Sequence, residues 1–270
     1  MASISHHTPL AAPRAQLSPA ERGLLALPML GGVVFGILPL FLPKLLAMLT
    51  GTPGNDPYIY WLAGAATLGY AAALGMGLRQ GAWAPLRLVV VAVLVFNLAS
   101  LYACATEIAG GQAQPLVYLI LVASLGFIAI SATLLRRHGA SVEAPDTATW
   151  LTRFLWYATL LATTFGLLAL LVPYLFGTTF GFQATDLFLY RQGGAATLGY
   201  AVMGVLELRS RRWEELRLPA IMAGTFNGIS FIASLVAIAT GQGSWLAYPV
   251  GLAALSVTLG CIIALRRQGQ

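Results

Sequence analysis

Charged residues are scarce in this chain of 270 residues. Asp, Glu, Lys and Arg together make up 9% of the sequence, whereas hydrophobic residues make up 58%. A soluble domain is about a quarter charged, because its water-exposed surface needs those side chains. The composition therefore excludes a soluble globular protein and a disordered chain, and a content of two cysteines excludes a disulfide-rich secreted scaffold. Together with the mean hydropathy of +0.79, it indicates an integral membrane protein.

Histidine and cysteine are also rare, and each shortage removes a class of chemistry. The histidines are His6, His7 and His138, and none falls in an apolar stretch, which excludes haem or chlorophyll ligation and a histidine proton relay inside the membrane. Cys104 and Cys261 do not form a Cys-x-x-Cys pair, so thiol redox chemistry is not expected. No nucleotide-binding loop, zinc-protease motif or nucleophile elbow occurs. We therefore predict no enzyme activity, no catalytic residue, no metal site and no cofactor.

Eight apolar stretches are each long enough to cross a bilayer as a helix, which takes about 20 residues. Turn-rich breaks separate them, such as Gly51–Pro57 and Gly241–Gly243. The alternating pattern of a β-barrel is absent, so we expect an all-α polytopic membrane protein. The predicted spans are Leu24–Leu49, Ile59–Leu78, Leu88–Ala109, Gln114–Leu135, Phe154–Phe176, Phe188–Leu208, Leu218–Thr240 and Ser244–Leu265.

The basic residues predict how the chain is oriented. Eight spans place both termini on one side of the membrane, and that side receives all of the 15 Lys and Arg residues except Lys44 and Arg191. Basic loops favour the cytoplasm, so we expect both termini there, in a bacterial-type inner membrane or a plasma membrane. The formal charge of +6 is then a topology signal that needs no nucleic-acid partner, and membrane lipids are the expected neighbours.

The sequence contains an internal repeat. Residues 61–139 align without a gap to residues 191–269, and the segment Gly64–Ala71 recurs unchanged as Gly194–Ala201. Four spans in each copy give both copies the same direction, which predicts two tandem parallel four-helix repeats about a pseudo-two-fold axis along the membrane normal. The expected organisation is a disordered cytoplasmic tail (1–21), a first repeat (22–139), a cytoplasmic linker (140–152) and a second repeat (153–270).

Polar residues retained in both copies form the candidate site. Asn97 lies ten residues after Arg87, so at ~1.5 Å per residue it is near mid-membrane. Such a layer fits either a solute pathway at the repeat interface or hydrogen bonds that hold helices together, and the sequence leaves both interpretations open. The ligand or pathway candidates are Asn97, Ser100, Thr67, Tyr70, Asn227, Ser230, Thr197 and Tyr200.

A second group of polar residues is predicted at the outer side. Asp56 and Asp186 precede Tyr60 and Tyr190, and they either form an extracellular mouth or cap the helices that follow. Arg191 has no counterpart in the first repeat, and it is close enough in sequence to pair with Asp186.

Two further acids have no acidic counterpart. Glu107 lies near the outer end of its span, where we expect it to be exposed at the interface. Glu207 falls at the cytoplasmic end of another span, where Arg211 can neutralise it.

Three functional hypotheses follow. The favoured one is a non-catalytic subunit or scaffold of a membrane complex, with lipid or hydrophobic-ligand contacts and further membrane subunits as partners. The alternative is a channel or carrier for a small polar or amphipathic solute, and the third is a lipid-modifying enzyme that lacks a recognisable catalytic set. A carrier should turn Asn97, Asn227, Thr67 and Tyr70 toward one shared cavity. A scaffold should bury them between helices and expose an apolar lateral face.

Overall fold

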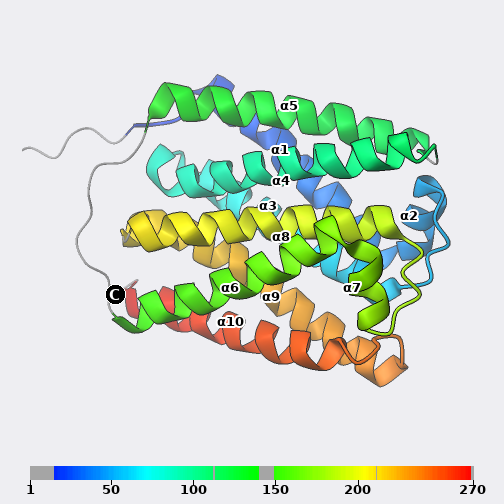
Figure 1. Ribbon diagram of the computed structural model, residues 1–270. Helices are drawn as coiled ribbons and strands as arrows, with labels where there is room; N and C mark the ends of the chain where they lie inside the picture. Colours follow the sequence, from blue (N-terminus) through cyan, green and yellow to red (C-terminus); the bar gives the residue numbers. More distant parts are fainter. Residues whose placement is uncertain (1–14, 112, 140–148, 211, 269–270) are drawn as a thin grey trace, which may run out of the picture.

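The computed structural model describes residues 15–268, apart from 112, 140–148 and 211, and this part of the chain is all-helical (Figure 1). It contains ten helices and no strand, with a single antiparallel bridge between Gln16 and Ala82. The helices are α1 (Pro19–Phe41), α2 (Pro43–Thr50), α3 (Pro57–Gln80), α4 (Trp83–Ala109), α5 (Pro115–His138), α6 (Thr149–Leu171), α7 (Pro173–Thr179), α8 (Leu187–Ser210), α9 (Trp213–Thr240) and α10 (Ala247–Gln268).

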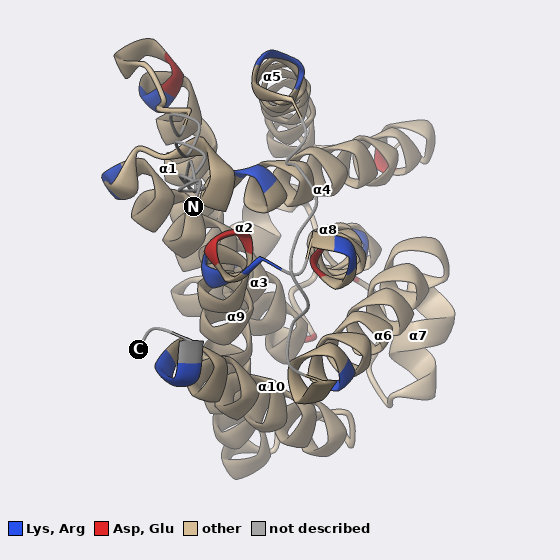
Figure 2. Ribbon diagram, turned by 90° about the vertical axis from the view of Figure 1, so that its left-hand side faces the viewer, with Lys and Arg blue, Asp and Glu red and all other residues tan. Residues whose placement is uncertain are grey.

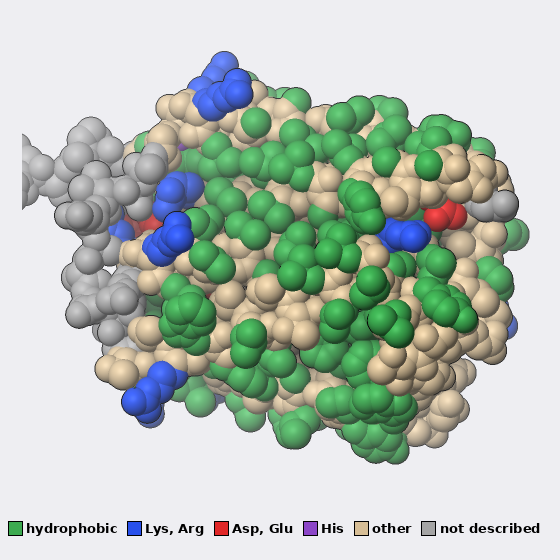
Figure 3. All heavy atoms as spheres, in the orientation of Figure 1, with side chains coloured by type: hydrophobic (Ala, Val, Ile, Leu, Met, Phe, Trp, Pro, Cys, Tyr) green, Lys and Arg blue, Asp and Glu red, His purple; other side chains and the backbone are tan. Residues whose placement is uncertain are grey.

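Within the described residues, seven helices are long and apolar enough to cross a membrane, namely α1, α3, α4, α5, α6, α9 and α10. The remaining predicted span, Phe188–Leu208, corresponds to α8, which has 24 residues but is less apolar overall than the other long helices. Hydrophobic side chains cover the middle of the face in Figure 3, and most of its basic side chains gather toward the left-hand end. The chain is therefore a membrane protein with transmembrane-type helices.

Two predicted spans are not single helices. Leu24–Leu49 is divided between α1 and α2, and Phe154–Phe176 is divided between α6 and α7. The reason is the proline that opens each short helix, because proline lacks an N–H and pushes the preceding residue out of the helical region. Leu42 and Val172 accordingly have φ of −130° and ψ of 50° and 53°.

The centre of the molecule consists of α3, α4, α8 and α9. The first half (15–139) and the second half (149–268) interlock there, because α3 packs on α9 and α4 packs on α8. The outer helices each cover one central helix: α1 lies on α3, α5 on α4, α6 on α8 and α10 on α9. Figure 2 shows α1 and α5 on one side of this centre and α6 and α10 on the other. The largest buried cluster, which includes Leu74, Leu86, Leu218 and Met222, fills the junction.

The two ends of the described chain lie at the same end of the bundle, which we call the terminal end; the opposite end is the far end (Figure 1). Helix ends carrying Lys and Arg face the viewer in Figure 2, which looks onto the terminal end. Residues 15–21 belong to the folded body although they fall in the predicted tail, because Leu17 N–H donates to Gly81 O at 2.9 Å and α1 starts at Pro19. Residues 1–14 of that tail and 140–148 of the predicted linker lie outside the described residues.

Candidate functional site: two lateral cavities

Two tyrosines fill the centre of the molecule, where the halves meet. The Tyr70 hydroxyl donates to Ala196 O at 2.7 Å, and the Tyr200 hydroxyl donates to Ala66 O at 2.8 Å. Their rings touch edge to face with centroids 5.0 Å apart, and both side chains are buried. The interface between the halves is therefore packed at this level, and these two candidates join helices rather than line an axial pathway.

The asparagines and threonines of the predicted polar layer bond to their own helices. The Asn97 amide donates to Val93 O at 2.7 Å, and the Asn227 amide donates to Ala223 O at 2.9 Å. Thr67 and Thr197 likewise donate to carbonyls four residues earlier, at 2.9 and 2.8 Å. These four groups neither bond across helices nor meet in one cavity. Instead, those of each half line a separate cavity.

The first-half cavity has a volume of about 100 Å³ and lies among α1, α3, α4, α5 and the start of α8. Its polar side chains bond to one another: Ser100 donates to Gln192 Oε1 at 2.9 Å, and Ser124 donates to Ser100 Oγ at 3.2 Å. Gln192 also donates to Cys104 Sγ at 3.7 Å. The candidate list missed Gln192, although its position opposite the apolar Leu62 in the internal alignment marks a polar residue that only one half carries.

The second-half cavity is larger, at about 170 Å³, and lies among α6, α8, α9 and α10 with part of α3. Asn227, Thr197 and Ser230 line it, together with Thr159 and Glu207, which the candidate list lacked. The hydroxyls of Thr159 and Ser230 are buried and have no hydrogen-bond partner within the described residues.

The environment of Glu207 differs from the one that the sequence predicts. It is 7% exposed and lines this cavity, rather than extending from the end of a span. Among the described residues, no side chain forms a hydrogen bond or an ion pair with it, and the expected partner Arg211 lies outside them.

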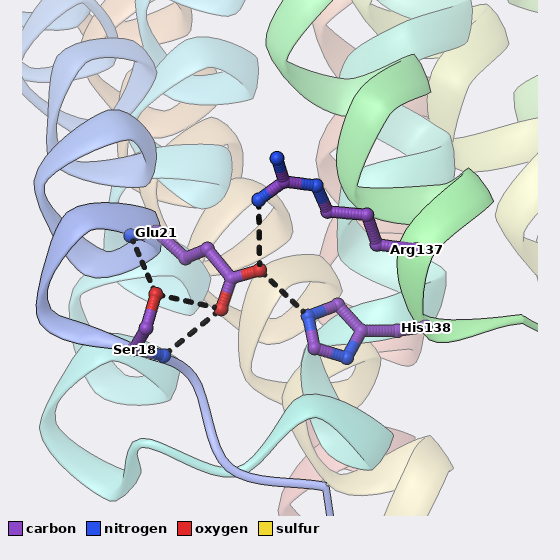
Figure 4. Close-up of polar contacts among 4 residues, drawn as sticks. All are labelled: Ser18, Glu21, Arg137 and His138. Carbon is purple, nitrogen blue, oxygen red and sulfur yellow. Dashed lines mark hydrogen bonds and ion pairs between the residues drawn. The ribbon is translucent and has the colours of Figure 1, made fainter.

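Side-chain contacts tie together the two outer helices beside each cavity, at the terminal end in the first half and near the middle of α10 in the second. In the first half, Glu21 on α1 accepts hydrogen bonds from Ser18 N–H at 2.9 Å and lies 3.0 Å from His138 Nε2 and 3.8 Å from Arg137 Nη1 on α5 (Figure 4). In the second half, the hydroxyls of Tyr157 on α6 and Ser256 on α10 are 3.0 Å apart. Neither cavity is fully enclosed.

The opening of each cavity lies on the lateral side of the molecule. Besides the central helices, both outer helices of each half contribute partly exposed lining residues: Ala162 on α6 and Val250 on α10 in the second half, and Gly31 on α1 and Phe127 on α5 in the first. These helix pairs make few contacts with each other. Each cavity therefore opens between two outer helices, and not along the molecular centre.

The acidic residues of the far end join the two halves. Asp56 accepts hydrogen bonds from the N–H groups of Gln183 and Ala184 at 3.1 and 3.0 Å and from the Tyr190 hydroxyl at 3.0 Å. Asp186 accepts one from Gly54 N–H at 3.2 Å. Asp56 makes no side-chain bond to its own helix, so the expected capping role is wrong for this residue.

Burial governs the electrostatics of this cluster. Asp56 and Asp186 are 3% and 0% exposed, so they do not form an open mouth. Burial raises the pKa of Asp186, although the hydrogen bond from Gly54 partly opposes the shift. The Tyr60 hydroxyl lies 2.8 Å from Thr52 Oγ1 in the same region.

Arg191 pairs with Glu107 and not with Asp186. Its guanidinium lies 3.9 Å from the Glu107 carboxylate, which joins α8 to α4. Glu107 is only 16% exposed, so the expected interfacial exposure gives way to a partly buried ion pair. Arg191 and Glu107, which both lack a like-charged counterpart in the repeat, therefore pair with each other.

No protein-family model, curated protein or solved structure matches this chain. Within its described part, no group of three or more His, Cys, Asp or Glu side chains is placed to hold a metal ion.

Proposed function

We propose that this protein is a non-catalytic integral membrane protein, a subunit or scaffold of a membrane complex, in which each half holds a hydrophobic or amphipathic molecule in a lateral cavity. The observation that carries the proposal is the pair of separate, mainly apolar cavities on either side of a packed centre. A carrier with its route along the centre would require the Tyr70–Tyr200 contact to open.

The volumes define what the cavities accommodate. A dry apolar cavity of about 150 Å³ accepts a benzene-sized molecule. The first-half and second-half cavities, at about 100 and 170 Å³, therefore suit a short alkyl segment, with the remainder of the ligand projecting between the outer helices. Membrane lipids are the most abundant molecules of this shape around a membrane protein.

The outer surface supports contact with lipid or with other membrane subunits. Large apolar side chains on α5, α6 and α10 are exposed, among them Val122 at 64%, Leu160 at 65% and Leu252 at 71%. An exposed apolar surface of this kind needs an apolar environment or an apolar partner.

The proposal includes eight spans arranged as two parallel repeats, with both termini in the cytoplasm. The bounds of α6 and α8 occupy the aligned positions of α1 and α3, and the helix breaks at Leu42 and Val172 also align. The reciprocal bonds of Tyr70 and Tyr200 are those expected of a pseudo-two-fold axis. In this topology α8 crosses the membrane inside the bundle, where neighbouring helices surround its polar residues.

A pair of cavity-filling variants tests the proposal. Ala123 and Ala253 align with each other, and each lines one cavity, so Ala123→Phe and Ala253→Phe fill the cavities separately. The protein is placed in nanodiscs with a phosphatidylcholine that carries a photoreactive diazirine at the end of one acyl chain, and labelled peptides are identified by mass spectrometry. We expect each variant to lose saturable labelling at its own cavity only.

The control variant is Leu125→Phe, at an exposed position of α5, which should leave labelling of both cavities unchanged. Unchanged labelling in both cavity-filled variants would contradict the proposal. Uptake of a solute into proteoliposomes that ceases when Asn97 and Asn227 are both replaced by Leu would favour the carrier instead.

A further inference from the structure

We propose that the second-half cavity binds an alkyl amine or a similar small lipophilic cation, with Glu207 as its counter-ion. This inference rests on the proposed function, because it identifies the chemical class of molecule that one of the two cavities takes. It goes further in distinguishing the two cavities, which share a position in the fold but present different polar groups.

Glu207 is the exception among the buried acids of the described chain. Glu21 lies beside His138 and Arg137, Glu215 lies 3.4 Å from Arg87, and both far-end aspartates accept backbone hydrogen bonds. Glu207 is buried to a similar degree, at 7% exposed, and has no such partner among the described residues. Burying an isolated carboxylate is costly, and a cation supplied by a ligand removes that cost.

Two more unsatisfied groups lie in the same cavity. Thr159 Oγ1 contacts the backbone of α8 at Gly204, which is one helical turn before Glu207 on the same face. This hydroxyl and that of Ser230 are buried without partners in the described chain. An ammonium group has three donors and no acceptor, so the Glu207 carboxylate together with the Thr159 hydroxyl provides acceptors for it. Ser230 lies beyond the middle of α9, farther along the cavity.

The first-half cavity supplies the contrast. In the first half, Gly77 aligns with Glu207 and Met29 aligns with Thr159, and neither residue lines the first-half cavity. Ser100, which aligns with Ser230, is already bonded to Gln192. The first-half cavity therefore has neither a free acid nor unsatisfied hydroxyls at these positions, and we expect it to take an uncharged apolar segment.

The rest of the second-half cavity suits an alkyl chain. Its wall includes the apolar side chains of Phe165, Phe176, Leu246 and Val257, and its opening lies between α6 and α10. A linear amine can place its ammonium group at Glu207 and its methylene groups along this wall. An anion of the same length would bring two negative charges together in a medium of low dielectric constant.

Photolabelling with a dodecylamine that carries a diazirine in its alkyl chain tests the inference. The protein is placed in phosphatidylcholine nanodiscs, because a zwitterionic surface does not concentrate cations. We expect saturable labelling of peptides from α6, α8 or α10. Unlabelled dodecylamine should displace the probe at a concentration at least about tenfold lower than the concentration of dodecanol or dodecanoic acid that has the same effect, because the amine forms a charge-assisted hydrogen bond.

The decisive variant is Glu207→Gln, which keeps the shape and removes the charge. It should weaken amine binding about tenfold and leave dodecanol binding unchanged. The matched control is Ser124→Ala in the first-half cavity, which should affect neither ligand. Should Glu207→Gln not fold, Ala253→Phe retains the carboxyl group while filling the cavity, and it should abolish saturable amine labelling.

The outcomes separate the inference from the proposed function. Equal displacement by the amine and the alcohol, or unchanged amine binding in Glu207→Gln, overturns the assignment of a cation. Amine labelling that persists in Ala253→Phe places the ligand elsewhere and also overturns it. If the photoreactive phosphatidylcholine still labels the cavities, the proposed function stands without the amine. If neither probe labels either cavity, both proposals are wrong.

Discussion

The close approach of Gly69 to the second half offers a quantitative test of the packed centre. A Cβ atom added at Gly69 would collide with the Tyr200 hydroxyl and lie 2.7 Å from Met222 O and 3.2 Å from Phe226 Cβ. The first contact disappears in Tyr200→Phe, whereas the contact with the Met222 backbone remains. Gly69→Ala, Tyr200→Phe and the double variant therefore form a thermodynamic cycle with a defined expectation.

The magnitudes follow from the contacts. Overpacking costs about 1–3 kcal/mol, while alanine gains about 1 kcal/mol over glycine in a helix, so Gly69→Ala should destabilise by about 1–2 kcal/mol. Tyr200→Phe loses one hydrogen bond, which is worth about 0.5–1.5 kcal/mol. In the Tyr200→Phe background the glycine substitution should cost about 1 kcal/mol less, because one of its two collisions has been removed.

The measurement is the free energy of unfolding in mixed micelles, followed by tryptophan fluorescence as denaturing detergent is added. Gly126→Ala is the control, since a Cβ at this helical position has no heavy atom within 4 Å and should be neutral or stabilising. The reasoning is refuted if Gly69→Ala is as stable as Gly126→Ala, or if its cost is the same in both backgrounds. The aligned pair Gly199 and Tyr70 should behave in the same way if the proposed repeat is correct.

Three further predictions concern the ends of the bundle. Burial raises the pKa of Asp186 above its ordinary 3.8, so the folded state favours the protonated acid. The contribution of this group to stability therefore falls as the pH rises above that ordinary value. In unfolding measurements from about pH 4 to 7, Asp186→Asn should become progressively more stable relative to wild type. Gly54 has φ +69°, and a Cβ added there would lie 2.8 Å from Ala47 Cβ, so Gly54→Ala should lower the unfolding free energy by about 2 kcal/mol or more. Gly111 has φ +71° in open space, so Gly111→Ala should cost about 1 kcal/mol. Equal costs would contradict the contact with Ala47. Glu21→Ala should keep the Ser18 cap but remove the other half of the capping box and the link to α5. It should lower stability by about 1 kcal/mol and increase amide exchange at Ser18, and unchanged exchange would contradict this role.

Hydropathy was sufficient to predict the membrane location and the approximate positions of the long helices. It missed the helix breaks at Leu42 and Val172, although Pro43 and Pro173 were visible signals, because both sides of each break are apolar. Hydropathy alone also does not decide whether α8 crosses the membrane, because this helix is less apolar than the other long helices. A position inside the bundle makes its Gln192 tolerable, and that position depends on tertiary packing.

The candidate residues were identified better than their partners. Asp56 was expected to cap its own helix because sequence reasoning looks for neighbours along the chain, whereas its donors lie in the loop of the other half. Arg191 and Glu107 were each recognised as unusual, but their pairing requires α4 to lie against α8. The same limitation hid the separation of the polar layer into two cavities, since composition does not reveal which side of the central helices a residue faces.

The interlocking of the halves has a consequence for biosynthesis. When the ribosome has completed α5, the Asp56 carboxylate still lacks the N–H groups of Gln183 and Ala184, and the Tyr58 hydroxyl lacks Ser234, its neighbour at 2.7 Å in the finished protein. At that stage α4 lacks α8, its main packing partner, and α3 lacks α9, its main partner in the second half. Unsatisfied polar groups are costly in lipid, so in the proposed eight-span topology the first half stays loosely associated until α8 and α9 have been inserted. A chain that ends at the linker would lack these bonding and packing partners of the first half, because the helices synthesised last supply them.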